Sequence, residues 1–153
     1  TEGDDDRSEC GFTKCPAKKC IVCTNFITEG TKFTSTITGE SYPITSHLHC
    51  KMTWLIYLIT CKKCTKQYVG KTTTSLYTRF NNTRSDTKYY KTDRGKSLPI
   101  AHHFNLPDHS ITDAKLMAIE KIHNHKEHII LHRESFWINR LHTLSPNGIN
   151  VDP

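Results

Sequence analysis

Residues 54–72 read WLIYLITCKKCTKQYVGKT, and this stretch decides the fold. Residues 54–59 form an almost unbroken apolar run, which is typical of a strand covered on both faces of a sheet. Residues 67–71, QYVGK, form a second short strand, so we predict that the two strands pair as a hairpin. Tyr57 and Tyr68 are then expected at matched places on the paired strands.

The turn of this hairpin holds Cys61 and Cys64 in a CxxC spacing. A CxxC pair in a hairpin aims both thiolates at one tetrahedral centre, which is the arrangement that zinc prefers. We therefore predict half of a zinc site at the turn.

The whole chain has 153 residues, a formal net charge of +6 and 10 histidines, and 35% of its residues are hydrophobic. This size predicts one domain, or one domain with a small appendage. The positive charge favours a polyanionic partner such as nucleic acid. No apolar run approaches the ~20 residues of a membrane span, so a membrane partner is not expected. Because residue 1 is threonine, we expect the chain to be part of a longer polypeptide.

Seven cysteines lie in two clusters, and each cluster contains a CxxC. An odd number of cysteines with histidines among them favours metal binding over a disulfide framework. Zinc thiolate sites also indicate a reducing, intracellular compartment.

The N-terminal third is expected to divide into an acidic disordered tail, residues 1–9, and a zinc-stapled β appendage, residues 10–52. Within the appendage, residues 24–46 read as extended, threonine-rich segments. Cys20, Cys23 and Cys50 are predicted to supply three ligands of its zinc. Cys15 is our choice for the fourth ligand, and Cys10 is the alternative.

Beyond the hairpin, the pattern predicts a helix that begins at a Ser75 cap and a polar loop over residues 84–96. A short helix over residues 98–105, a third strand over 111–122, a helix over 125–141 and a final turn over 145–150 follow. In the polar loop, two aromatic rings stand between two lysines, in the order Lys88, Tyr89, Tyr90 and Lys91. This segment either contacts a nucleic-acid strand or is a solvated loop.

Glu134 falls in the middle of the apolar stripe of the last helix, beside Ile130, Trp137 and Leu141. A buried carboxylate is costly unless it binds a metal or an ion-pair partner. We favour a metal ion, and a salt bridge to Arg79 or Arg133 is the alternative.

The two strand motifs, Ile56-Tyr57-Leu58 and Tyr68-Val69-Gly70, resemble the signature of the GIY-YIG nucleases. The cysteine pair between them is similar to that of the Penelope-like retroelement proteins. The resemblance continues in chain order from residue 54 to the end, through Leu76-x-x-Arg79, Pro99-x-x-x-His103-Phe104, His109, Arg133-Glu134 and Pro146-x-Gly148-x-Asn150.

The resemblance implies an α+β fold over residues 53–153, with a small, mainly antiparallel three-stranded sheet flanked by helices. It implies that His103 and His109 complete the zinc site of Cys61 and Cys64, and His102 is the competing ligand. The implied catalytic group comprises Tyr57 or Tyr68 as general base, Arg79 on the phosphate, Glu134 on magnesium or manganese, and Asn150 in support. Lys71, Lys88, Tyr89 and Lys91 are the residues expected to bind DNA.

We therefore expect a divalent-metal-dependent endonuclease that nicks DNA in the nucleus to prime reverse transcription for a retrotransposon. It would be joined to a reverse transcriptase, with template RNA as a further partner. One departure supports a rival function: the family usually has a histidine one helical turn after the arginine, and here that residue is Thr83. The rival is a zinc-dependent nucleic-acid-binding module without catalysis, and a protein-interaction domain is a third alternative.

Overall fold

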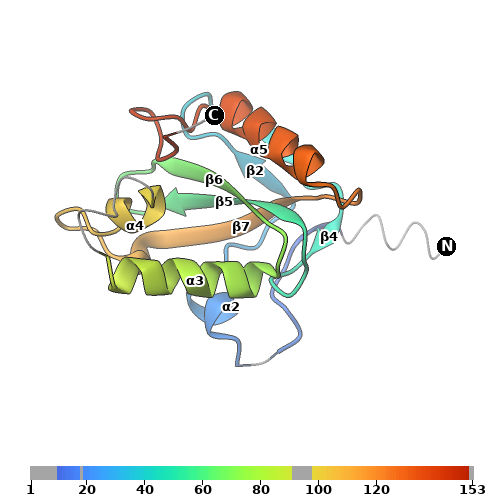
Figure 1. Ribbon diagram of the computed structural model, residues 1–153, viewed down its shortest axis with the longest axis horizontal. Coiled ribbons are helices and arrows are strands. Elements are labelled where there is room, and N and C mark those ends of the chain that lie inside the picture. The colour runs from blue at the N-terminus through green and yellow to red at the C-terminus, as the bar shows by residue number, and fades with distance from the viewer. Residues whose placement is uncertain (1–9, 18, 91–97, 152–153) are drawn as a thin grey trace.

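A three-stranded antiparallel sheet lies at the centre of the computed structural model, which describes residues 10–17, 19–90 and 98–151 (Figure 1). The strand order is β6 (Gln67–Thr72), β5 (Leu55–Cys61) and β7 (Ala114–Lys121). β5 is buried along almost its whole length, because it pairs on both edges and carries apolar side chains on both faces. The predicted hairpin and third strand are confirmed.

The register of the hairpin differs from the prediction for the two tyrosines. Tyr57 pairs with Gly70, and Tyr68 pairs with Ile59. The tyrosines are therefore diagonal neighbours on one face, with ring centroids 6.4 Å apart. The expected register is wrong because the length of the turn, and not the positions of the tyrosines, fixes which residues of the two strands lie opposite one another.

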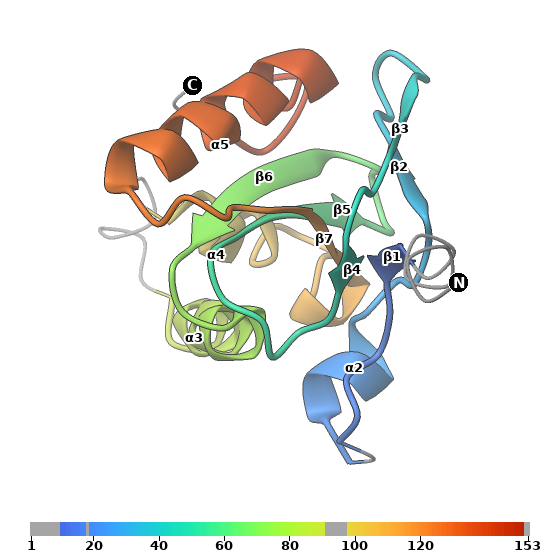
Figure 2. The same cartoon turned by 90° about the vertical axis from the view of Figure 1, so that its right-hand side faces the viewer.

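Two long helices lie on opposite faces of this sheet, α3 (Leu76–Lys88) on one and α5 (Glu127–Leu141) on the other (Figure 2). The Ser75 side chain caps α3 as predicted, by accepting a hydrogen bond from the Thr78 amide. The short helix α4 (Pro99–His103) lies beside α3 at one end of the sheet (Figure 1). A single 3₁₀ turn, Ile111–Asp113, leads into β7.

The prediction of a loop from residue 84 is wrong for residues 84–88, which continue α3. These residues are polar, but they contain no glycine or proline that would end a helix. Thr87 is buried, and its hydroxyl donates to the Thr83 carbonyl one turn earlier. Local polarity thus gave the wrong boundary, and packing of the last turn sets the real one.

The described part of the N-terminal segment contains four short strands, β1 (Gly11–Phe12), β2 (Lys32–Thr34), β3 (Ser41–Pro43) and β4 (His47–Leu48). It also contains a five-residue helix that the pattern did not predict, α2 (Ile21–Asn25). The segment shares a core with the rest of the chain: the Phe26 ring packs on Phe80 of α3, with centroids 4.9 Å apart. Leu116 of β7 exchanges backbone hydrogen bonds with residues 26 and 28.

The proposed division at residues 52 and 53 stays a prediction, although the two parts are packed together. The expected acidic tail, residues 1–9, lies outside the described residues. Within the described part of the chain, no helix is both long enough and apolar enough to cross a lipid bilayer.

Candidate active site and metal centres

A small hollow of about 70 Å³ opens between the sheet and α3, and it gathers three of the predicted catalytic side chains. Tyr57 comes from the central strand, Tyr68 from β6 and Arg79 from the first half of α3. The Arg79 Nε donates to the Tyr57 hydroxyl oxygen over 3.4 Å. The hollow thus places a phenol and a guanidinium in contact, from segments 22 residues apart.

The electrostatics of the hollow distinguish the two tyrosines. Burial raises the pKa of Tyr57, and the positive charge of Arg79 opposes that rise. Burial raises the pKa of Tyr68 as well, and the neighbouring Tyr57 raises it further. The attraction to Tyr57 is also the main cause of the raised pKa of Arg79. Arg79 therefore stabilises an ionised Tyr57 more than an ionised Tyr68.

Gly70 allows this close packing because it lies directly opposite Tyr57 in the hairpin. A Cβ at residue 70 would overlap the Cζ and the hydroxyl oxygen of the Tyr57 ring. The glycine is required here for space, and the ring of Tyr57 fills the place of the missing side chain.

Glu134 is half-buried on α5 and lies near the positive charges of Lys71 and Arg79. Burial raises the pKa of its carboxyl group, and those two cations partly offset the rise. Among the described residues, Glu134 makes no hydrogen bond or ion pair through its side chain. An ionisable group in this state is a candidate for binding a cation.

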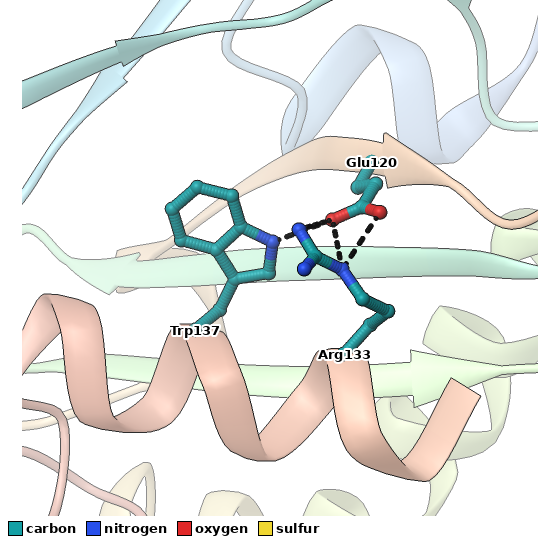
Figure 3. A network of polar contacts seen from close by, with 3 residues as sticks. All are labelled: Glu120, Arg133 and Trp137. Atoms are coloured by element: carbon teal, nitrogen blue, oxygen red, sulfur yellow. Dashed lines mark hydrogen bonds and ion pairs between the residues drawn. The ribbon is translucent and has the colours of Figure 1, made fainter. Parts of the chain in front are cut away.

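The alternative partner Arg133 is engaged elsewhere, as Figure 3 shows. Its guanidinium donates to both carboxylate oxygens of Glu120 on β7, over 2.8 to 3.1 Å. The Trp137 indole donates to the same carboxylate over 2.7 Å. This network connects α5 to β7, and because it occupies Arg133, that arginine is not the ion-pair partner of Glu134.

Asn150 returns to the edge of β6, as the final turn predicts. Its amide side chain accepts a hydrogen bond from the Val69 amide and donates to the Val69 carbonyl. The Thr143 hydroxyl donates to the same Asn150 oxygen over 2.7 Å. Asn150 thus pairs with the strand that carries Tyr68 and does not line the hollow itself.

One candidate metal centre joins the hairpin turn to the segment after α4. The ligand atoms of Cys61, Cys64, His103 and His109 all lie within 4.8 Å of one another. His109 Nε2 is buried and has no hydrogen-bond partner among the described residues, which fits a ring nitrogen directed at a cation. Burial lowers the pKa of His103 to about 4, so its imidazole is neutral and able to bind metal. His102 turns away, and its Nδ1 lies 2.8 Å from the Tyr90 hydroxyl.

The second candidate centre lies in the N-terminal segment. It brings together Cys15, Cys20, Cys23 and Cys50, again within 4.8 Å of one another. The Cys50 sulfur lies 3.8 Å from that of Cys20 and 3.4 Å from that of Cys23. Tetrahedral zinc with Zn–S bonds of about 2.3 Å separates its sulfurs by roughly 3.8 Å, so the donor set fits zinc. The alternative ligand Cys10 lies outside this cluster, and its thiol donates to the Thr45 carbonyl.

The residues expected to bind DNA are divided between two places. Lys71 is on β6, close enough to Glu134 to lower the pKa of its carboxyl group. Lys88 and Tyr89, at the end of α3, line a separate groove of about 630 Å³ that shares no lining residue with the hollow. Lys91 lies outside the described residues.

Asp86 is a site residue that the sequence reasoning missed. It lines the hollow together with Thr83 and Arg79, and its charge contributes to the raised pKa of Arg79. Spacing along α3 is the signal that would have found it, because residues 79, 83 and 86 recur on one helical face. The hollow therefore has a carboxylate one turn beyond Thr83.

Comparisons with known proteins bear on the family and the fold of this chain. The family model described as the GIY-YIG catalytic domain matches residues 53–150. No curated protein matches the chain in sequence. In fold, the chain is similar to the catalytic domain of the homing endonuclease I-TevI, with a TM-score of 0.51 and 23% sequence identity. That likeness covers 66% of this chain and 100% of the other.

Proposed function

Because the chain belongs to the GIY-YIG family, whose catalytic domain implies DNA endonuclease activity, we propose that it nicks DNA in a reaction that requires a divalent metal ion. The observation that carries the proposal is the hollow in which Tyr57, Tyr68 and Arg79 meet. Phosphodiester hydrolysis requires a proton acceptor for the attacking water and positive charge at the phosphate. The hollow supplies both, and the half-buried Glu134 stands nearby without an ion-pair partner among the described residues.

In this reaction the oxygen of Tyr57 accepts the proton of the attacking water. Tyr57 is preferred to Tyr68 because Arg79 donates to its oxygen and stabilises the phenolate. The remaining N–H groups of the Arg79 fork hold the scissile phosphate and offset its growing charge. Lys71 contacts the phosphate backbone, and Asn150 keeps β6 in place through Val69.

Glu134 is the residue proposed to hold magnesium or manganese. A single carboxylate suits a hard cation that keeps most of its ligands as water and phosphate oxygens. When bound, such an ion supplies positive charge that offsets the charge developing on the phosphate.

Two further ions are proposed to be structural zinc, one in each of the two clusters of candidate ligands described above. A catalytic zinc keeps one ligand position for water or substrate. Each of these clusters has four protein donors, which complete a tetrahedron, so both ions are assigned a structural role. Lys88 and Tyr89 of the groove beside α3, together with Lys91, are proposed to bind DNA away from the nick.

The biological setting is the part of the proposal that rests on sequence resemblance. The cysteine pair in the hairpin turn is similar to that of Penelope-like retroelement proteins. We accordingly propose that the nick primes reverse transcription by a reverse transcriptase in the same polypeptide, with template RNA nearby. Cleavage of chromosomal DNA would place this activity in the nucleus.

Thr83 supports a second candidate function, a zinc-dependent nucleic-acid-binding module without catalysis. A threonine cannot transfer a proton near neutral pH as a histidine does. Burial also raises the pKa of both tyrosines, so neither is ionised without help at that pH.

Supercoiled plasmid separates the two functions. We expect the purified chain to convert it to the open-circular form with magnesium, and not when the divalent ion is withheld. Arg79→Ala should abolish conversion, whereas Arg140→Ala, a change on the exposed part of α5, should not. Salt-dependent binding of plasmid by a folded chain without any nick would favour the binding module.

Gly70→Ala tests the packing of the hollow. The added Cβ must displace the Tyr57 ring from Arg79, so we expect at least tenfold slower nicking and a loss of about 1–3 kcal/mol in the free energy of unfolding. Urea denaturation and initial nicking rates measure the two effects. Gly30→Ala is the control, because its Cβ would press only on the flexible end of Met117 and would make an ordinary van der Waals contact with the Lys32 carbonyl. If the two changes had equal effects on nicking and stability, the close contact between residue 70 and the Tyr57 ring would not be what holds Tyr57 in place.

A further inference from the structure

A second cavity lies at the same end of the sheet as α4, and nothing in the reaction described so far uses it. Its volume is about 610 Å³. Its walls come from the hairpin turn at Lys66, just before β6, and from Tyr90, just after α3. They also come from α4 at Pro99 and His102 and from the final turn at Ile149. Figure 1 shows these segments gathered at one end of the sheet. We call this cavity the Lys66 cleft.

The Lys66 cleft adjoins the hollow. Pro99 lines both, so α4 forms the partition between them. Lys66 precedes Tyr68 by two residues on an extended chain, which separates them by roughly 7 Å along the strand at ~3.3 Å per residue. Phosphates of one DNA strand follow one another at about 3.4 Å along the duplex axis. The cleft is therefore within one or two nucleotides of a phosphate held in the hollow.

The side chains of the Lys66 cleft suit a nucleotide. Tyr90 and His102 present two aromatic rings, with centroids 5.9 Å apart, on which a base can stack. The Tyr90 hydroxyl lies 2.8 Å from His102 Nδ1, which orients both polar groups for hydrogen bonding to a base edge. Lys66 adds a positive charge, and no acidic residue is among the described residues that line the cleft.

The size of the cleft points in the same direction. Cavities of about 300–1,000 Å³ hold compact ligands, and a single nucleotide falls well within that range. Apolar contacts from Ile149 and Leu106 complete the walls. The hollow, in contrast, is far too small for a base.

We propose that the Lys66 cleft binds one nucleotide of the cleaved strand, next to the scissile phosphate, and that it gives the enzyme a base preference at that position. The proposal rests on the proposed nicking function, because it places the cleft on the cut strand. An acidic peptide is the competing occupant, since it would also be attracted by Lys66.

The first test is binding, which does not depend on nicking. Deoxynucleoside 5′-monophosphates, titrated into the intact chain and followed by NMR or calorimetry, should bind with one stoichiometric site. Tyr90→Ala removes the stacking ring and should weaken that binding about tenfold. Lys66→Gln, an exposed change that leaves the fold intact, should weaken it as well. Tyr42→Phe, whose hydroxyl bonds to Glu40 elsewhere, should leave it unchanged.

The second test is the position of the nicks, mapped over a plasmid of mixed sequence. Wild-type chain should show a base preference at a position within two nucleotides of the nick. Tyr90→Ala should reduce that preference and raise KM more than it lowers kcat. Nucleotide binding that depends on Tyr90 without any nicking would reject the nicking function and keep the cleft as a nucleotide site. Unchanged base preference with no nucleotide binding, or preferential binding of an acidic peptide, would overturn the assignment.

Discussion

Cys61→Ser is expected to unfold the part of the chain built around the three-stranded sheet and to release one zinc ion per chain. Cys61 ends β5, and two of its candidate co-ligands, His103 and His109, lie beyond α3. The site therefore ties the hairpin turn to a segment about 40 residues later, since Cys64 and His103 are 39 residues apart. Zinc binding contributes ~10–16 kcal/mol in finger peptides, which is as large as the whole stability of a typical domain. Far-ultraviolet circular dichroism and elemental analysis measure the loss of structure and of metal. We expect two zinc ions in the wild-type chain and a folded fraction near zero at 37 °C for the variant.

Cys10→Ser is the matched control for this experiment. It removes a thiol of the same chain that lies outside both clusters of candidate ligands. It should therefore retain both zinc ions and melt within a few degrees of wild type. Wild-type protein without zinc, or a Cys61→Ser variant as stable as Cys10→Ser, would show that the cluster in the hairpin turn is not a structural metal site.

The parts of the fold that sequence predicted are those fixed by local chemistry. The apolar run of β5, the CxxC turn and the Ser75 cap each act within a few residues, so they can be read from short segments. The helix α2 could not be read in this way. It has only five residues and no side-chain cap. Its position follows from Cys20 at its N-cap, from Cys23 in its middle and from the packing of Phe26 against Phe80.

The candidate site shows the same limit. Spacing and resemblance named Tyr57, Arg79 and Glu134, but they could not show that Arg133 is paired with Glu120 on a different strand. They favoured Cys15 as the fourth ligand of the N-terminal cluster and kept Cys10 as the alternative, because either is near enough in sequence to reach the cluster. The partner of Arg133 and the fourth cysteine of the cluster both depend on tertiary contacts, which local sequence patterns do not contain.

Glu134→Gln is expected to abolish nicking while leaving DNA affinity within about twofold of wild type. The change keeps the shape of the side chain and removes the charge proposed to hold the divalent ion. Plasmid conversion with magnesium or manganese measures the nicking, and salt-dependent binding to duplex DNA measures the affinity. Glu127→Gln is the matched control, because Glu127 is exposed in the first turn of the same helix.

The stability of Glu134→Gln separates a metal ligand from a structural ion pair. Burial raises the pKa of Glu134 in the folded chain, so the folded state holds its proton more tightly than the unfolded state does. The carboxylate therefore costs no stability below about pH 4, and the cost grows as pH rises through the raised pKa. Without added divalent metal, the glutamine variant should melt at an equal or higher temperature than wild type at pH 7.5, and the difference should vanish near pH 4. A variant that melts far below wild type at pH 7.5, and still nicks DNA while folded, would make Glu134 a structural residue and require another ligand for the ion.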